Sequence, residues 1–105
     1  SGTDAHAVGS DLYVVNRGTA AEAAALVLAR DLRLQGLRVA LDPGGSAFGK
    51  QFKRADRSGA PWAAVLGDDE LTQGVVLLKP LRGQACGERR VELNDRSALM
   101  AMLRE

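Results

Sequence analysis

Short apolar runs alternate with segments of helical pattern in the first part of this chain, and this order limits the fold more than any other feature. The apolar runs lie at 11–16, 37–41 and 62–66, with helical patterns at 19–35 and 46–58 between them. A helix that joins two strands of one sheet implies a parallel pair and a right-handed crossover. We therefore expect an α/β fold whose chain begins β-α-β-α-β.

The last part of the chain predicts two more strands and a final helix. Residues 74–79 and 87–93 have strand patterning, and the short PLRGQA segment between them favours an antiparallel pair. Asp95 is placed to cap a helix over the remaining residues. The runs at 11–16 and 62–66 are the most continuously apolar, which is typical of strands covered on both faces. The sequence thus predicts a five-stranded mixed sheet with these two runs in the middle and helices on both faces.

Polar residues near the first two helical segments predict where these helices begin. Thr19, with Glu22 three residues later, fits a capping box. Ser46 follows a turn made of Asp, Pro and two Gly, and it is a good cap for the second helix. The acidic residues 68–70 come directly after a strand, and we expect a turn there.

Composition excludes several classes of protein. The chain has one Cys, Cys86, and one His, His6, so it lacks the ligands of a closed zinc site. A single Cys favours a reducing, cytoplasmic location, and no apolar run is long enough to cross a membrane. Residues 1–10 are polar and contain Gly, so we expect a linker or cloning remnant there and one domain over 11–105.

The second helical segment is strongly amphipathic. At about 100° per residue, apolar residues that include Phe48 and Phe52 share one side. Four cations share the other: Lys50, Lys53, Arg54 and Arg57. Both Phe side chains are expected to be buried, which leaves few aromatic rings for stacking on bases. Because the formal net charge is only +1, a nucleic-acid partner would depend on this patch, and a solvated helix face is the alternative.

The same region has a second interpretation. Gly44, Gly49 and Lys50 fit the G-x-x-x-x-G-K spacing of a phosphate-binding loop, and the turn precedes a helix whose N-terminus attracts anions. That motif continues with Ser or Thr, which holds Mg²⁺, but Gln51 stands here. A small nucleotide-binding protein is therefore an alternative to an RNA-binding domain.

The segments GKQFKRADRSGAPWAAVLGDDEL and VVLLKPLRG together resemble the anticodon-binding domain of class IIa aminoacyl-tRNA synthetases. The match is best for the histidyl enzymes, and it covers residues 11–105. The matching positions are Gln51, Phe52, Ala55, Asp56, Gly59, Ala60, Leu66, Gly67 and Glu70. The threonyl, prolyl and glycyl relatives share the Gly-x-x-Glu turn and stay open as alternatives. A synthetase-like paralogue or regulator that does not charge tRNA is another.

The resemblance implies a fold, a function and partners. The implied fold is a three-layer α/β/α arrangement with a five-stranded mixed sheet in the order 2-1-3-4-5 and strand 4 antiparallel. The implied function is to hold the anticodon arm of a tRNA, that of the histidine isoacceptor, while a separate catalytic domain charges the tRNA. ATP and Mg²⁺ would bind that catalytic domain, so no cofactor is expected in this one. The parent protein is expected to be a cytoplasmic homodimer.

The resemblance also assigns contacts with the anticodon. Glu70 and Lys79 match positions that meet anticodon bases, and Lys53 and Gly45 match further contact positions. Unpaired bases expose their pairing edges, so a carboxylate can accept from a base N–H and an ammonium can donate to a base oxygen. A helix cap for Glu70 and a strand-end charge for Lys79 are the structural alternatives.

Other polar residues are expected near the anticodon loop. Residues beside the second helix approach the loop, which adds Lys50, Gln51 and Arg54. Arg17 and Arg82 are candidate phosphate contacts. No residue is assigned a catalytic role or a metal. We expect all the assigned groups to converge on one concave surface.

Overall fold

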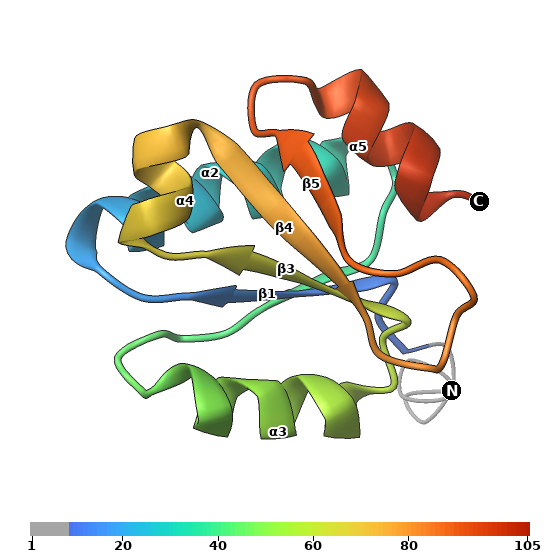
Figure 1. The fold of residues 1–105 in the computed structure, drawn as a ribbon, viewed down its shortest axis with the longest axis horizontal. Coiled ribbons are helices and arrows are strands. Elements are labelled where there is room, and N and C mark those ends of the chain that lie inside the picture. The colour runs from blue at the N-terminus through green and yellow to red at the C-terminus, as the bar shows by residue number, and fades with distance from the viewer. Residues whose placement is uncertain (1–8) are drawn as a thin grey trace.

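In the computed structural model, which describes residues 9–105, strands and helices alternate as the apolar pattern predicts (Figure 1). Residues 1–8, most of the expected N-terminal linker, lie outside the described residues. The elements in chain order are β1 (Leu12–Asn16), α2 (Thr19–Leu34), β2 (Val39–Leu41), α3 (Phe48–Ser58), β3 (Trp62–Leu66), α4 (Asp68–Gln73), β4 (Val75–Pro80), β5 (Arg89–Glu92) and α5 (Arg96–Leu103).

The five strands form one mixed sheet in the order β2-β1-β3-β4-β5. β1 pairs in parallel with both β2 and β3, whereas β4 runs antiparallel to both β3 and β5. Every residue of β1 and β3 is buried, as expected for strands with neighbours on each side and helices on each face. The predicted sheet order and the predicted direction of strand 4 are confirmed.

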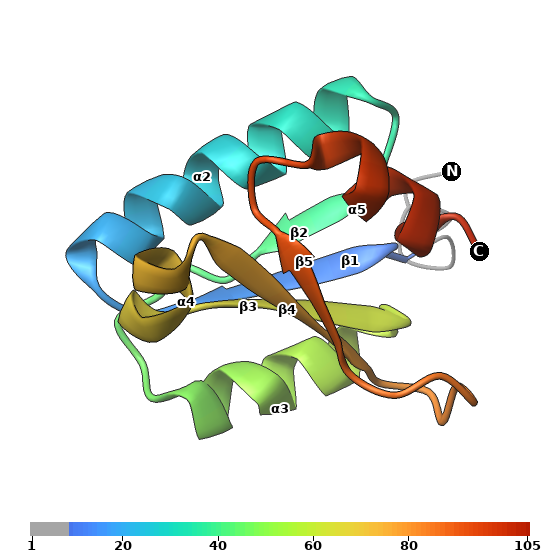
Figure 2. The same ribbon diagram turned by 45° about the horizontal axis from the view of Figure 1, so that its top comes forward.

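Helices cover the two faces of the sheet unequally. α2 and α5 lie on one face, and α3 lies on the other (Figures 1 and 2). The larger apolar cluster belongs to the α2 and α5 side, where Leu28, Leu32 and Leu99 are fully buried. The cluster under α3 is smaller and includes Tyr13 and Val15 of β1.

This inequality leaves part of the sheet open on the α3 side. Five strands about 4.8 Å apart span roughly 19 Å, whereas one helix with its side chains covers about 10–12 Å. α3 packs chiefly on β1, so the strip formed by β4 and β5 has no helix over it on this face (Figure 2). A pocket lies between α3 and the uncovered part of the sheet, over β3 and β4.

The predicted caps of α2 and α3 are wrong. Gly18 and Ala47 occupy the cap positions, and neither makes a side-chain cap hydrogen bond. Thr19 is already the first residue of α2, so it stands one position too late to cap it. Ser46 stands one position too early for α3, and its hydroxyl instead accepts a hydrogen bond from Arg54 at 3.1 Å.

Two other details concern α4 and α5. A short helix, α4, replaces the turn expected at residues 68–70, and its first turn holds three acidic residues. Negative charge suits the N-terminal end of a helix, which carries the positive end of the backbone dipole. The predicted cap of α5 is confirmed, because the Asp95 carboxylate accepts a hydrogen bond from the Ala98 N–H at 3.0 Å.

Candidate nucleic-acid interface

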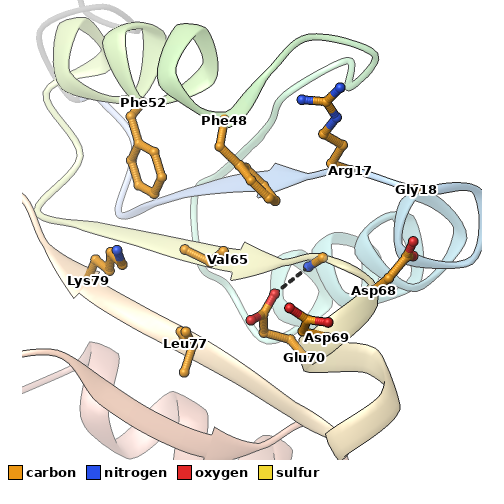
Figure 3. A pocket seen from close by; sticks show the side chains of 11 residues that line it. Arg17, Gly18, Phe48, Phe52, Val65, Asp68, Asp69, Glu70, Leu77 and Lys79 are labelled. Carbon is orange, nitrogen blue, oxygen red and sulfur yellow. Dashed lines mark hydrogen bonds between the residues drawn. The ribbon is translucent and has the colours of Figure 1, made fainter.

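A pocket of about 640 Å³ opens on the α3 side of the sheet. Its walls come from α3, from β3 and β4, and from the segments that follow β1 and β3 (Figure 3). Three of the residues assigned RNA contacts from the sequence line it: Arg17, Glu70 and Lys79. The sheet topology explains this, since Arg17 and Glu70 follow the carboxyl ends of parallel neighbours β1 and β3.

The apolar part of the pocket is aromatic on one side. Phe48 and Phe52 lie one turn apart on α3, with ring centroids 6.4 Å apart and ring planes tilted by 47°. They face Val65 and Leu77 of the sheet across the cavity (Figure 3). Both rings pack against the apolar cluster under α3 but are only partly buried, so the prediction that they are buried is wrong in part. The open strip beside α3 is the reason, because no second helix closes over the rings.

Glu70 caps a helix at the rim of the pocket. Its Oε1 accepts a hydrogen bond from the Gly67 N–H at 2.8 Å (Figure 3). A Cβ at position 67 would lie 2.9 Å from this oxygen and 3.3 Å from Phe48 Cζ, so a side chain there would push the Glu70 carboxylate aside. The Gly-x-x-Glu motif therefore has a structural role. A carboxylate offers about four lone-pair sites, so the cap leaves Glu70 acceptor capacity for a ligand.

Lys79 lies on β4 toward the other end of the pocket (Figure 3). Its Nζ is 5.4 Å from the centroid of the Phe52 ring and 3.9 Å from Glu88 Oε1. Nearly half of both the Lys79 and the Glu88 side chains is exposed, so this ion pair contributes little and can exchange for a ligand. The ammonium group is thus held beside an aromatic face, where it can reach an acceptor on a stacked ring.

Carboxylates outnumber cations around the pocket. Asp68, Asp69 and Glu70 supply three negative charges, and Arg17 and Lys79 supply two positive ones. The difference is a formal charge of −1 for these lining residues. Such a lining favours groups that donate hydrogen bonds, for example the amino groups of bases, over a bare phosphate.

Gln51 does not reach the surface, which argues against the predicted RNA contact. The side chain is fully buried. Its Oε1 accepts a hydrogen bond from the Asn16 N–H at 2.9 Å, and its Nε2 donates to the carbonyl oxygens of Asn16 and Ser46 at 2.8 Å each. Gln51 thus ties α3 to the end of β1 and to the turn before α3.

Arg54 belongs to an internal network centred on Asp42. Asp42 is buried and accepts hydrogen bonds from the Tyr13 hydroxyl at 2.6 Å, the Gly44 N–H at 2.9 Å and Arg54 Nη1 at 3.1 Å. Burial opposes ionisation of Asp42, but these hydrogen bonds outweigh it and hold the pKa of the carboxyl below its usual range. Burial also raises the pKa of Tyr13, so its hydroxyl remains a donor. The geometry favours support of the Gly44 turn over the predicted RNA contact for Arg54.

The other assigned residues lie outside the pocket. Lys50 and Lys53 are exposed on the side of α3 away from the two Phe rings, and Gly45 is exposed in the preceding turn with φ of 78°. Arg82 forms an ion pair with Asp56 at 3.2 Å. The expectation of one shared concave surface is therefore wrong in part. The pocket unites only three of the assigned groups: Arg17, Glu70 and Lys79.

A known protein family matches most of this chain. The family model described as "Anticodon binding domain" matches residues 11–102. The chain belongs to this family. The resemblance seen in the sequence is thereby confirmed for the anticodon-binding domain as a class.

Proteins similar to this anticodon-binding domain include histidine–tRNA ligases. A histidine–tRNA ligase of Synechococcus sp. (strain WH7803) is 61% identical over 93 residues, which are 89% of this chain and 21% of that protein. Structures of histidyl-tRNA synthetase from S. aureus and Nostoc sp. PCC 7120 both align with a TM-score of 0.77 over 92% of this chain, at 29% and 27% identity. They are covered over 24% and 23% of their lengths. The chain therefore spans about a fifth to a quarter of each relative.

Across residues 9–105, no group of three or more His, Cys, Asp or Glu is placed to hold a metal ion. None of the helices described has the length and apolar character that crossing a membrane requires. What the pocket of this domain offers chemically is an aromatic surface, carboxylates and an ammonium group.

Proposed function

We propose that this domain binds the anticodon arm of a tRNA and reads anticodon bases in the pocket beside α3. One observation carries the proposal: partly exposed Phe48 and Phe52 lie between a carboxylate, Glu70, and an ammonium group, Lys79. Bases that are unstacked in a loop can lie on aromatic rings and present their pairing edges to such groups. Membership in the anticodon-binding family supports the same partner.

The two polar ends of the pocket suit different edges of a base. Glu70 accepts hydrogen bonds, so it fits the N1–H and N2 amino group of guanine or the N4 amino group of cytosine. Lys79 donates, so it fits a base O6 or O4. Arg17, exposed at the rim, can contact a phosphate near the bound base.

We further propose that the tRNA is the histidine isoacceptor and that the parent protein is a cytoplasmic, homodimeric histidine–tRNA ligase. The support is the 61% identity with a histidine–tRNA ligase. In this proposal ATP, Mg²⁺ and histidine bind in the part of the parent that this chain does not cover. An aminoacylation assay of the longer protein tests the ligase activity. Sedimentation of the same protein tests the dimer. Loss of charging with retained RNA binding would favour a non-charging paralogue.

Substitutions of Glu70 and Lys79 test base recognition in the pocket. We expect Glu70→Gln and Lys79→Ala each to lower affinity for a stem-loop RNA with the histidine anticodon about tenfold, since one good base contact is worth about 1–3 kcal/mol. Affinity for a stem-loop with an unrelated loop should fall less. Gln at position 70 can still accept the Gly67 hydrogen bond, so α4 keeps its cap. Fluorescence anisotropy titrations measure both affinities.

A matched control and a contrary outcome complete this experiment. Glu92→Gln removes an exposed carboxylate from β5, outside the pocket, and should leave the preference between the two RNAs unchanged. Equal losses for both RNAs in the Glu70 and Lys79 variants would contradict base reading. Stem-loops with threonine, proline and glycine anticodons serve as competitors, and tighter binding of one of these would reassign the isoacceptor.

Titration with Mg-ATP separates this proposal from a nucleotide-binding protein. A phosphate-binding loop needs a hydroxyl ligand for Mg²⁺ after its Lys, but Gln51 occupies that position, is fully buried and uses both of its amide atoms internally. We therefore expect no saturable binding of Mg-ATP to this chain. ATP binding without RNA binding would overturn the proposed function.

A further inference from the structure

The charges around the pocket do not account for binding of a polyanion. Three carboxylates face two cations there, so the pocket can select a base but adds little attraction for the RNA backbone. Phosphate contacts from Lys and Arg supply most of the affinity in protein–nucleic acid complexes. Exposed cations elsewhere on the domain can therefore add to the single phosphate contact proposed for Arg17.

The outer side of α3 carries exposed cations that can contact phosphates. Lys50, Lys53 and Arg57 are exposed, and at about 100° per residue they fall within an arc of roughly 60°. We call these three residues the α3 stripe. Among residues 9–105, none of the three has a carboxylate within ion-pair distance.

Neighbouring charges on α3 differ from the stripe in this respect. Arg54 is bound to Asp42 at 3.1 Å, and Asp56 is bound to Arg82 at 3.2 Å. Both pairs lie on the flanks of the helix, so they leave the stripe itself without compensation. The stripe therefore carries a local charge of +3 on a chain whose formal net charge is +1.

The stripe is also separated from the pocket. Phe48 and Phe52 face the sheet, and the stripe lies on the opposite side of α3, which is about 10–12 Å wide with its side chains. From Lys50 to Arg57 the stripe is about 10.5 Å long, which is longer than one phosphate group. A nucleotide whose base lies in the pocket cannot place its own phosphate along the whole stripe.

We propose that the α3 stripe binds phosphates of the paired anticodon stem while the pocket holds a loop base. This rests on the proposed function and assigns a second, separate part of the RNA to the domain. In this arrangement the RNA passes over α3, with the loop on the sheet side and the stem on the outer side. Arg57 thereby becomes an RNA-binding residue. Neither the phosphate-binding-loop spacing nor the family resemblance assigns it this role.

The experiment compares a stem-loop RNA with the same loop sequence as an unpaired oligonucleotide. We expect Lys50→Gln, Lys53→Gln and Arg57→Gln each to weaken stem-loop binding about fivefold to tenfold at 0.1 M salt and to lower the slope of log K against log salt by about 0.9. The unpaired oligonucleotide should lose less than twofold. Arg30→Gln, which removes an exposed cation from α2 on the other face of the sheet, is the matched control and should change neither RNA.

Each contrary result has a distinct meaning. Wild-type affinity and salt slope in Arg57→Gln would overturn the stripe proposal, while a lost loop preference in Lys79→Ala would still uphold the proposed function. Equal losses for the stem-loop and the oligonucleotide would place the stripe on the loop and refute the stem assignment. If the unsubstituted chain bound neither RNA, the proposed function and the stripe would both fail.

Discussion

Lys53 and Arg54 are adjacent cations on α3 with opposite surroundings. Lys53 is exposed and has no carboxylate partner among the residues that the structure describes. Arg54 donates two hydrogen bonds to the buried carboxylate of Asp42 and one to Ser46. Their charges are equal in the sequence, yet the Arg54 charge is paired with Asp42 and the Lys53 charge faces solvent.

This contrast predicts separate effects of Lys53→Ala and Arg54→Ala. Lys53→Ala should lower the salt slope of RNA binding by about 0.7–0.9 and leave the free energy of unfolding within about 0.5 kcal/mol. Arg54→Ala should leave the slope unchanged and lower the free energy of unfolding by about 1–3 kcal/mol, because charge-assisted hydrogen bonds to Asp42 are lost. Anisotropy at several salt concentrations and urea denaturation measure both. A reduced slope in Arg54→Ala would mean that Arg54 contacts phosphate after all.

At the scale of an element, α3 packs on the sheet over a small apolar cluster, and Gln51 adds polar contacts to β1. The apolar cluster beneath the helix is the smaller of the two. Gln51 compensates by satisfying both backbone groups of Asn16, which is itself 2% exposed. Gln51 thus helps to anchor the helix that carries both the stripe and the aromatic wall of the pocket.

Substitution of Gln51 therefore should cost stability. We expect Gln51→Leu to lower the free energy of unfolding by about 2–4 kcal/mol, since a buried N–H and a buried C=O of Asn16 lose their partner at about 1–3 kcal/mol each. Lys50→Gln, on the exposed side of the same turn, is the control and should change stability by less than about 0.5 kcal/mol. Urea denaturation followed by circular dichroism measures both variants, and equal stabilities would refute the anchoring role.

The strands were easier to predict from the sequence than the sides of this helix. Apolar runs and short turns determine which strands are central and which pair is antiparallel, and the family resemblance supplies the order of the sheet. The burial of Gln51 depends on its hydrogen bonds with Asn16, 35 positions earlier in the chain. No local sequence pattern reveals this contact. The exposure of Phe48 and Phe52 depends on how many helices share one face. Counting helix widths against sheet width is the signal that would have located the pocket.

For the whole molecule, the unequal covering of the sheet separates stability from recognition. The face under α2 and α5 holds the large apolar cluster, while the face under α3 combines a small cluster with the pocket. Ionic links stabilise the molecule at distant points: Asp11 with Arg38, Asp31 with Arg96, and Asp42 with Arg54. These links give the fold a common dependence on pH.

Acid should weaken this fold below about pH 4, and the direction follows from three carboxyl groups. Hydrogen bonds from Arg38 lower the pKa of Asp11, and those from Arg30 and Arg96 lower the pKa of Asp31. The pKa of Asp42 is lowered as well. A carboxyl group with a lowered folded-state pKa stabilises the fold fully above its unfolded pKa, about 3.9, and loses that contribution as pH falls through the folded value.

We therefore expect the free energy of unfolding to be nearly constant between pH 7 and pH 5 and to decline steadily from about pH 4 downward. Asp42→Asn should be less stable than the unsubstituted chain at pH 7 and should lose less stability on acidification, because one of the three titrating links is gone. Urea denaturation at a series of pH values measures both curves. Stability that rises on acidification from pH 5 to pH 3 would contradict the assigned links, and parallel curves for the two proteins would remove Asp42 from them.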